Sequence, residues 1–379
     1  MNFIFIKYLL LITLFLIATN LKAFSQARFA AIGDYGSAGP NELAVANLVK
    51  SWNPDFIITL GDNNYEVGSD STIDANIGQY YHEYIYPYKG SYGDGSLNNK
   101  FYPSLGNHDW AAQNAEPYLN YFELPDNERY YDFTEKNIHF FVLDSDPNEP
   151  DGIDENSLQA KWLKDALQNS SSQMWNVVYF HHPPYSSGPH GSTAYMRWPF
   201  RKWGADIILS GHEHNYERLY ADSLFYVVNG LGGKSIYSFL APIPESLVRY
   251  NDNYGAMFIE SNNSEMIFKF INVNGFLIDS FKITRVNLIV KPERFYLYQN
   301  SPNPFNSNTI IKYNIPEQGK ISLKVFDVLG NEIATLVNEE KSYGFYDVSY
   351  NAINLSSGVY IYRLQTETFY EAKKMIYLK

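Results

Sequence analysis

Nine side chains that can bind metal ions or transfer protons stand in short polar motifs of this sequence, most of which follow an apolar run. They are Asp34, Asp62, Tyr65, Asn107, His108, His181, His182, His212 and His214. Five of the eight histidines fall in only three of these motifs, and the chain has no cysteine. Without thiolates, a set of nitrogen and oxygen donors suits iron, manganese or zinc. Metal binding is therefore the first chemistry that these residues indicate.

The motif His212-Glu213-His214 allows two geometries. On an extended segment, two histidines that flank one residue point the same way. Around a turn, the same two side chains splay and reach two neighbouring ions. The sequence leaves both open.

Short apolar runs that end in polar residues predict β-strands. They cover residues 29–32, 56–60, 140–143, 177–180 and 207–209. Between the first two runs, after Pro40, a buried helical stripe is expected from Leu43, Val45, Ala46, Leu48 and Val49. This α/β alternation places the polar residues at the carboxyl ends of strands, where binding sites are normally built.

The order of these motifs resembles the calcineurin-like metallophosphoesterases. The matching motifs are Gly33-Asp34-Tyr35-Gly36, Gly61-Asp62-Asn63-Asn64-Tyr65, Gly106-Asn107-His108-Asp109, His181 and Gly211-His212-Glu213-His214. Gly36 stands where many members have a histidine, and Tyr65 follows Asp62 by three, which is the purple acid phosphatase pattern. Residues 215–218 (Asn-Tyr-Glu-Arg) also fit that subfamily. The resemblance implies an α/β sandwich of two mixed sheets flanked by helices. The alternation in residues 254–283 predicts its last antiparallel strands.

The resemblance also implies a ligand set for two metal ions. Asp34, Tyr65 and His214 would bind the first ion, whereas Asn107, His181 and His212 would bind the second, and Asp62 would bridge both. The choice of His181 over His182 rests on the family spacing to Pro183 and Tyr185. His182 is expected beside the site.

The phenol of Tyr65 points to a particular metal. Its ordinary pKa is about 10, so it binds as phenolate near neutral pH only beside a strong Lewis acid. Ferric iron fits this requirement, with zinc, manganese or ferrous iron as the second ion. In the implied reaction a metal-bridging hydroxide attacks a phosphate monoester, His108 protonates the leaving alkoxide, and His190 orients the phosphate.

Several other polar residues are expected to be structural. Asp144 and Asp146 follow a buried strand, and His139 lies within one. His82 lies in a tyrosine-rich segment, which predicts a packing role or a pocket wall. Pocket walls are expected from residues 63–92 and 183–198.

The first 25 residues have the pattern of a cleaved signal peptide. The apolar run 8–18 is shorter than the roughly 20 residues that a membrane-spanning helix needs. Ala23 and Ser25 suit a signal peptidase. An uncleaved anchor is the alternative. We expect the mature chain to start near Gln26 and to contain no transmembrane span.

Residues 296–379 differ in character from the preceding part. Short alternating runs separated by turns predict a small all-β sandwich there. The segment resembles the C-terminal sorting domain of type IX secretion, in residues 297–306, 325–330, 355–360 and 373–375, and the run 299–306 is highly specific. This implies contact with the type IX secretion machinery and export through the periplasm and outer membrane to the cell surface or medium. An ordinary β-sandwich binding module is the alternative.

These observations predict a domain order and limit the function. We expect a signal peptide (1–25), a catalytic domain (26–285), a linker (286–295) and a sorting domain (296–379). The net charge of -12 argues against nucleic-acid binding. Nearly all of it lies in residues 27–285, which hold 17 Lys and Arg against 32 Asp and Glu. A small phosphate monoester is the expected substrate. A phosphodiesterase or nucleotidase with the same metal site, and a catalytically dead surface binding module, remain alternatives.

Overall fold

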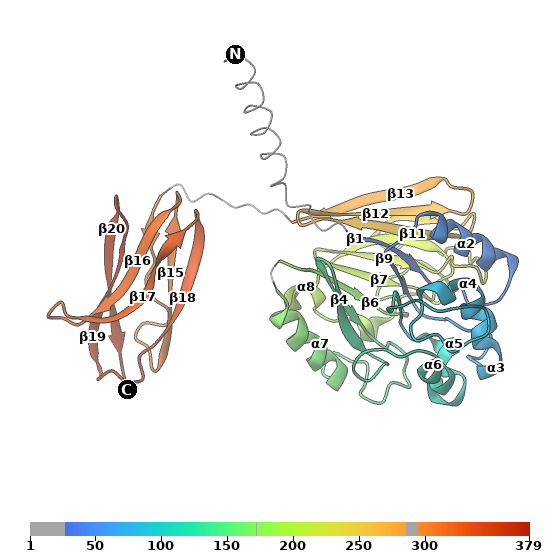
Figure 1. The fold of residues 1–379 in the computed structure, drawn as a ribbon, viewed down its shortest axis with the longest axis horizontal. Coiled ribbons are helices and arrows are strands. Elements are labelled where there is room, and N and C mark those ends of the chain that lie inside the picture. The colour runs from blue at the N-terminus through green and yellow to red at the C-terminus, as the bar shows by residue number, and fades with distance from the viewer. Residues whose placement is uncertain (1–26, 172, 286–293) are drawn as a thin grey trace, which may run out of the picture. The chain divides into compact units, whose positions relative to one another are not determined.

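The computed structural model describes residues 27–171, 173–285 and 294–379 (Figure 1). The chain divides into two compact units, which meet in sequence at Arg285 and Val286. The predicted signal peptide and residues 286–293 of the predicted linker lie outside the described residues. Within the described ranges, no helix is both long enough and apolar enough to cross a membrane.

The first unit contains two mixed β-sheets. The six-stranded sheet has the order β13-β12-β11-β1-β2-β3 and the seven-stranded sheet the order β10-β8-β9-β7-β6-β5-β4. The strands of the first sheet are β1 (Ala27–Ile32), β2 (Phe56–Thr59), β3 (Phe101–Pro103), β11 (Gly255–Ser261), β12 (Glu265–Asn272) and β13 (Leu277–Thr284). Those of the second are β4 (Tyr131–Glu135), β5 (Ile138–Val142), β6 (Trp175–Tyr179), β7 (Ile207–Ser210), β8 (Tyr216–Ala221), β9 (Leu224–Asn229) and β10 (Ser246–Tyr250).

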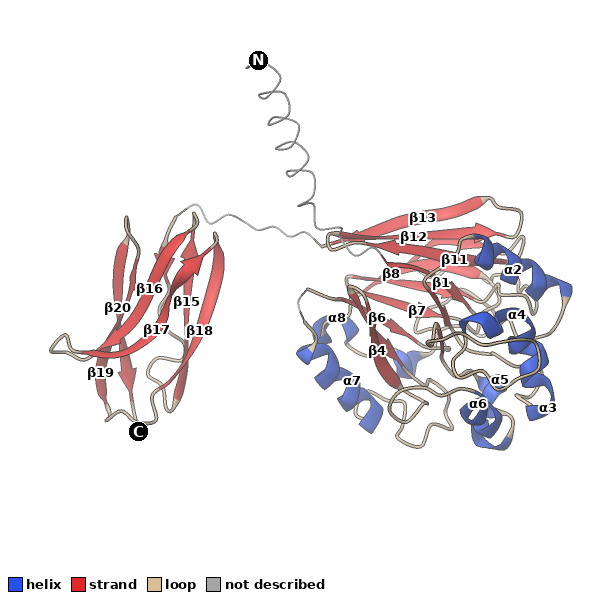
Figure 2. Cartoon of the chain, viewed as in Figure 1, coloured by secondary structure: helices blue, strands red, loops and turns tan. Residues whose placement is uncertain are grey.

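Helices flank the two sheets (Figure 2). They are α2 (Pro40–Ser51), α3 (Asp70–Ile73), α4 (Gln79–Tyr81), α5 (Asn107–Trp110), α6 (Glu116–Tyr121), α7 (Leu158–Asn169) and α8 (Phe200–Trp203). Shorter 3₁₀ or π turns are η2 (Asp74–Gly78), η3 (His82–Tyr84), η4 (Gln113–Ala115) and η5 (Ala194–Met196). The predicted α/β fold with two mixed sheets and outer helices is confirmed.

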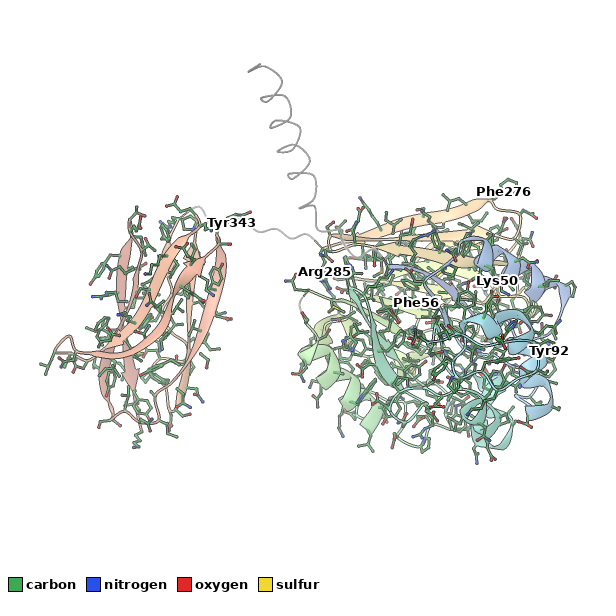
Figure 3. The ribbon with its side chains drawn as sticks, in the orientation of Figure 1. Lys50, Phe56, Tyr92, Phe276, Arg285 and Tyr343 are labelled. Atoms are coloured by element: carbon green, nitrogen blue, oxygen red, sulfur yellow. The ribbon has the colours of Figure 1, made fainter. Side chains whose placement is uncertain are left out.

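The core has two layers because strand side chains alternate between the faces of a sheet. Phe140, Val177 and Ile207 lie in the cluster between the sheets, whereas their neighbours Phe141, Val178 and Ile208 lie in the cluster that includes α7 and α8. Phe56, labelled in Figure 3, stacks on Phe29 with ring centroids 5.0 Å apart and meets Phe140 edge-on at 5.4 Å. These rings join the two sheets.

The predicted helical stripe needs one correction. Val45, Ala46 and Val49 of α2 are buried, but Leu43 is 48% exposed. The buried residue of the first turn is Glu42, whose carboxylate accepts hydrogen bonds from the backbone N–H groups of Ser37 and Ala38. Capping of this loop places a polar residue inside and turns Leu43 outward.

The second unit is an all-β sandwich, as predicted. One sheet contains β14 (Tyr296–Leu297), β15 (Asn308–Ile315) and β18 (Gly344–Asn351); the other contains β16 (Gly319–Phe326), β17 (Glu332–Lys341), β19 (Gly358–Gln365) and β20 (Tyr370–Tyr377). Every strand pair is antiparallel. Asn300, from the specific motif at 299–306, is buried: its N–H donates to the Tyr362 hydroxyl and its Nδ2 to Thr309 Oγ1. That motif thus fixes a loop onto the sandwich core.

Candidate metal centre

The predicted donors converge because the parallel strands of both sheets end at one edge of the first unit. Strands β1, β2 and β3 pair in parallel, and so do β5, β6, β7 and β9. Asp34, Asp62 and Asn107 follow β1, β2 and β3, whereas His181 and His212 follow β6 and β7. The loops are joined by backbone hydrogen bonds from Asp34 N to Gly61 O (3.2 Å) and from Gly211 N to His181 O (3.0 Å).

The first donor set surrounds the Tyr65 hydroxyl. This oxygen lies 3.1 Å from Asp34 Oδ1, 2.8 Å from Asp62 Oδ2 and 3.1 Å from His214 Nε2. His214 Nε2 also lies 3.2 Å from Asp34 Oδ1. All four residues are buried.

The second donor set surrounds His181 Nε2. This nitrogen lies 3.3 Å from Asp62 Oδ2, 3.2 Å from Asn107 Oδ1 and 3.2 Å from His212 Nδ1. Asp62 Oδ2 therefore belongs to both sets. The structure thus brings together all seven residues that were predicted as metal ligands, and it places Asp62 between the two groups.

The donor atoms fit two cations that share one carboxylate. Ligands lie about 2.0–2.2 Å from such an ion, so two ligands at right angles are about 3 Å apart, which is the spacing seen in both sets. Asp34 and Asp62 are buried carboxylates that face a phenol and imidazoles, and a bound cation would offset their charge. The first set, with two carboxylates and a phenol, is the harder one and suits the more highly charged ion.

Three predicted ligands adopt a backbone conformation that is rare outside glycine. The φ angles of Asp34, Asp62 and His212 are 57°, 53° and 68°. Such conformations cost of the order of 1–3 kcal/mol each and persist where the surroundings enforce them. At Gly61 (φ 88°), a Cβ atom would lie 2.4 Å from His181 Nδ1, so only glycine lets this loop meet the histidine. The His212-Glu213-His214 segment is a turn rather than a strand, so its two histidines reach different donor sets.

Surrounding groups orient four of the predicted ligands. One carboxylate oxygen of each aspartate accepts a backbone N–H: Asp34 Oδ2 from His212 and Asp62 Oδ1 from His108, both at 2.9 Å. The Nδ1 atoms of His181 and His214 bond to Leu60 O (2.8 Å) and Ser235 Oγ (2.5 Å). These contacts leave the other oxygen or Nε2 free to face the site.

Burial and the neighbouring carboxylates shift the pKa values of two predicted ligands, His181 and Tyr65. Burial acts to lower the pKa of His181, but the Asp62 carboxylate outweighs burial and raises that pKa to about 10. Burial raises the pKa of the Tyr65 phenol well above its usual value, and Asp34 and Asp62 raise it further. A cation that binds here must therefore displace protons from both side chains.

The two histidines predicted for catalysis lie beside the donor sets. His108 Nε2 is 4.0 Å from Asp62 Oδ2, and its Nδ1 bonds to the Glu66 carbonyl. Because a carbonyl only accepts, Nδ1 carries the hydrogen and Nε2 faces the site. The His190 ring lies 4.5 Å from the His212 ring, with Nδ1 3.4 Å from the buried carboxylate of Glu213.

His182 lies beside the second donor set without joining it. Its ring centroid is 4.4 Å from that of His212, and its Nδ1 lies 2.9 Å from Ser145 Oγ. Burial, and next the neighbouring His181, lower its pKa to about 3. The other polar residues interpreted as structural make local contacts outside both sets: Asp144 with Trp110, Asp146 with Asn148, His139 with Asp132, and His82 with Gly78.

Sequence reasoning missed a third group of residues, which follows β9. Ser235 holds His214, and the Tyr237 ring stacks on the His214 ring at 4.1 Å with an angle of 6°. Lys234 places its Nζ 4.8 Å from the centre of the Tyr65 ring. The glycine-rich run 230–233 directly after a strand was the available signal.

Comparison with known proteins gives two family matches. Residues 27–216 match the family of calcineurin-like phosphoesterases, and residues 301–378 match the secretion system C-terminal sorting domain. The chain is 26% identical to purple acid phosphatase 17 of Arabidopsis thaliana, over 67% of this chain and 83% of that protein. It is 25% identical to tartrate-resistant acid phosphatase type 5 of Homo sapiens, over 65% of this chain and 88% of that protein.

Two solved structures share the fold of the first unit. Purple acid phosphatase PPD1 from yellow lupin seeds aligns with a TM-score of 0.54 at 18% identity, over 69% of this chain and 54% of that chain. GAP50, described as the anchor in the inner membrane complex of Plasmodium, aligns with a TM-score of 0.54 at 20% identity, over 68% and 89%. At these identities the likeness supports the fold alone.

Proposed function

The chain belongs to the calcineurin-like phosphoesterase family, and from that premise we propose that it hydrolyses small phosphate monoesters in the manner of purple acid phosphatases. Its homologues are acid phosphatases, and the catalytic unit is a metal-dependent phosphoric ester hydrolase. The sorting domain directs the protein to the cell surface or medium by the type IX route. We further propose the domain order given above, with the mature catalytic domain at 26–285, the linker at 286–295 and the sorting domain at 296–379.

The observation that carries this proposal is the pair of donor sets around Asp62 Oδ2. Asp34, Tyr65, His214 and Asp62 would hold ferric iron, and Asn107, His181, His212 and Asp62 would hold zinc, manganese or ferrous iron. Two such ions would lower the pKa of a water nucleophile and would offset charge on the phosphoryl oxygens. The chain's own residues then orient the ester and supply the proton.

His108 is proposed to supply that proton. Its Nδ1–H is fixed on the Glu66 carbonyl, so its protonated Nε2 donates toward the site. As the bond between phosphorus and the leaving oxygen breaks, this proton passes to the leaving oxygen. His190, held by Glu213, would donate to a phosphoryl oxygen.

The test of the function is an assay of the purified, metal-loaded mature chain with p-nitrophenyl phosphate and bis(p-nitrophenyl) phosphate in competition. Preferential hydrolysis of the monoester supports the proposal. Preference for the diester favours a phosphodiesterase or nucleotidase. A protein that binds metal but hydrolyses neither ester favours the surface binding module.

We expect His108→Ala to slow alkyl phosphate hydrolysis by about 100-fold, the lower end for loss of a general acid. Hydrolysis of p-nitrophenyl phosphate should slow much less, because its leaving group departs without a proton. Steady-state kinetics with both substrates measure this difference. His139→Gln, a histidine on β5 paired with Asp132, is the control and should keep the wild-type ratio of the two rates. An equal loss for both substrates in His108→Ala would argue against the acid role.

A further inference from the structure

Lys234 lies in a loop that is fixed to the first donor set. The loop follows β9, and the Lys234 N–H donates to the backbone oxygen of Asp34 at 3.2 Å. Two residues earlier, the Gly232 N–H donates to Gly33 O at 2.9 Å, and a Cβ on Gly232 would lie 2.3 Å from that oxygen. These contacts therefore fix the main chain of Lys234 next to the predicted metal ligand Asp34.

The side chain of Lys234 reaches the same edge of the site. Its Nζ lies 4.8 Å from the centre of the Tyr65 ring and forms an ion pair with Glu66. The His108 ring also contacts the Tyr65 ring, at 4.4 Å. An ammonium group and the proposed proton donor are thus both in contact with the residue whose hydroxyl lies at the centre of the first donor set. None of the chemistry described above uses this ammonium group.

The partner of Lys234 is one that an anionic substrate could replace. The Glu66 side chain is 69% exposed, and an ion pair with such an exposed partner is weak because water and salt screen it. A phosphate monoester carries about -1.5 to -2 charges at pH 7, whereas a diester carries one. The monoester therefore gains more than the diester from replacing the Glu66 carboxylate beside the Lys234 ammonium.

We propose that Lys234 binds the phosphoryl group of the substrate and gives the site its preference for phosphate monoesters over diesters. The inference rests on the proposed function and names a residue that sets its substrate class. Glu66 holds the ammonium at the edge of the site until substrate arrives. The Glu66 carbonyl meanwhile fixes His108.

The experiment uses the metal-loaded mature chain and measures inorganic phosphate binding by calorimetry, together with KM and kcat for the monoester and diester. We expect Lys234→Gln to weaken phosphate binding and raise the monoester KM by about tenfold, with less than about a twofold change in the diester KM and unchanged metal content. Lys234→Arg should keep most of the affinity. Glu66→Gln should strengthen phosphate binding by up to about fivefold, because it removes the competing carboxylate.

Lys269→Gln is the matched control. Lys269 also pairs with a glutamate (Glu260, 2.7 Å) and lies over an aromatic ring (Phe258, 5.7 Å), but it is on β12 and contacts no predicted ligand. Wild-type phosphate affinity and ester preference in Lys234→Gln would overturn the proposal, and so would loss of metal from it, which would indicate support of Tyr65 instead. A wild-type chain that hydrolyses neither ester but binds phosphate in a Lys234-dependent way would refute the proposed function alone.

Discussion

Replacing Asp62 with asparagine is expected to empty both metal positions together and to lower monoester hydrolysis by more than about 100-fold. Replacing a residue that only orients a metal ligand already lowers metal affinity or activity by about 10–100-fold. Asp62 Oδ2 is the atom shared by both donor sets, so its loss should have a larger effect. Asparagine cannot supply the same two acceptors. Because Asp62 Oδ1 accepts the His108 N–H, the new NH₂ group must face either that N–H or the metal positions. Metal analysis and steady-state kinetics measure the result.

Asp279→Asn is the matched control for this substitution. Asp279 is also a buried carboxylate of the first unit, but it accepts from Arg218 Nε at 2.7 Å and from the Tyr216 hydroxyl, where β8 and β13 join the two sheets. Its loss should destabilise the fold and leave the metal content per folded chain unchanged. An Asp62→Asn protein that keeps both ions and the wild-type rate would refute the bridging role. Loss of only one ion would assign Asp62 to a single set.

The convergence of the seven predicted metal ligands could be foreseen from the sequence because most of them stand in short motifs at the end of an apolar run. Strand polarity then determines the rest: parallel strands bring their carboxyl ends to one edge, so motifs as distant as Asp34 and His214 had to meet there. The resemblance to a family added the pairing of ligands with ions. The spacing of His212 and His214 alone left open whether they point together or apart, because this depends on a φ of 68° at His212.

Lys234, Ser235 and Tyr237 could not be predicted in the same way. Their roles arise from contacts between loops of different strands: Ser235 with His214, Tyr237 on the His214 ring, and Lys234 over Tyr65. Hydrophobic periodicity carries no information about such contacts. The predicted burial of Leu43 was wrong for a related reason. The helical stripe predicted that its side chain is buried, but the preceding loop requires the buried carboxylate of Glu42 instead.

Tyr65 gives the second large prediction, a complete change of colour. If ferric iron occupies the first donor set, the wild-type protein should show a broad absorption band near the middle of the visible range, from charge transfer between the phenolate and iron. Tyr65→Phe keeps the ring that contacts His108 and Lys234 and removes only the oxygen. We expect it to lose the band entirely and to bind iron more weakly, because the site loses one of its hard donors. Visible spectra and metal analysis on the same samples measure both effects.

Tyr237→Phe is the matched control for Tyr65→Phe, because it removes a tyrosine hydroxyl beside the site. The Tyr237 ring stacks on the ring of the predicted ligand His214, but its hydroxyl is in neither donor set, so this variant should keep the band. A band that survives in Tyr65→Phe would mean that another group is the coloured ligand. A colourless wild-type protein that is active with zinc or manganese would show that ferric iron does not occupy the first donor set. The phosphoesterase proposal would then rest on the two donor sets that share Asp62. Asp62→Asn tests whether one carboxylate binds both ions, and Tyr65→Phe tests the identity of one ion. Either prediction can therefore be contradicted without the other.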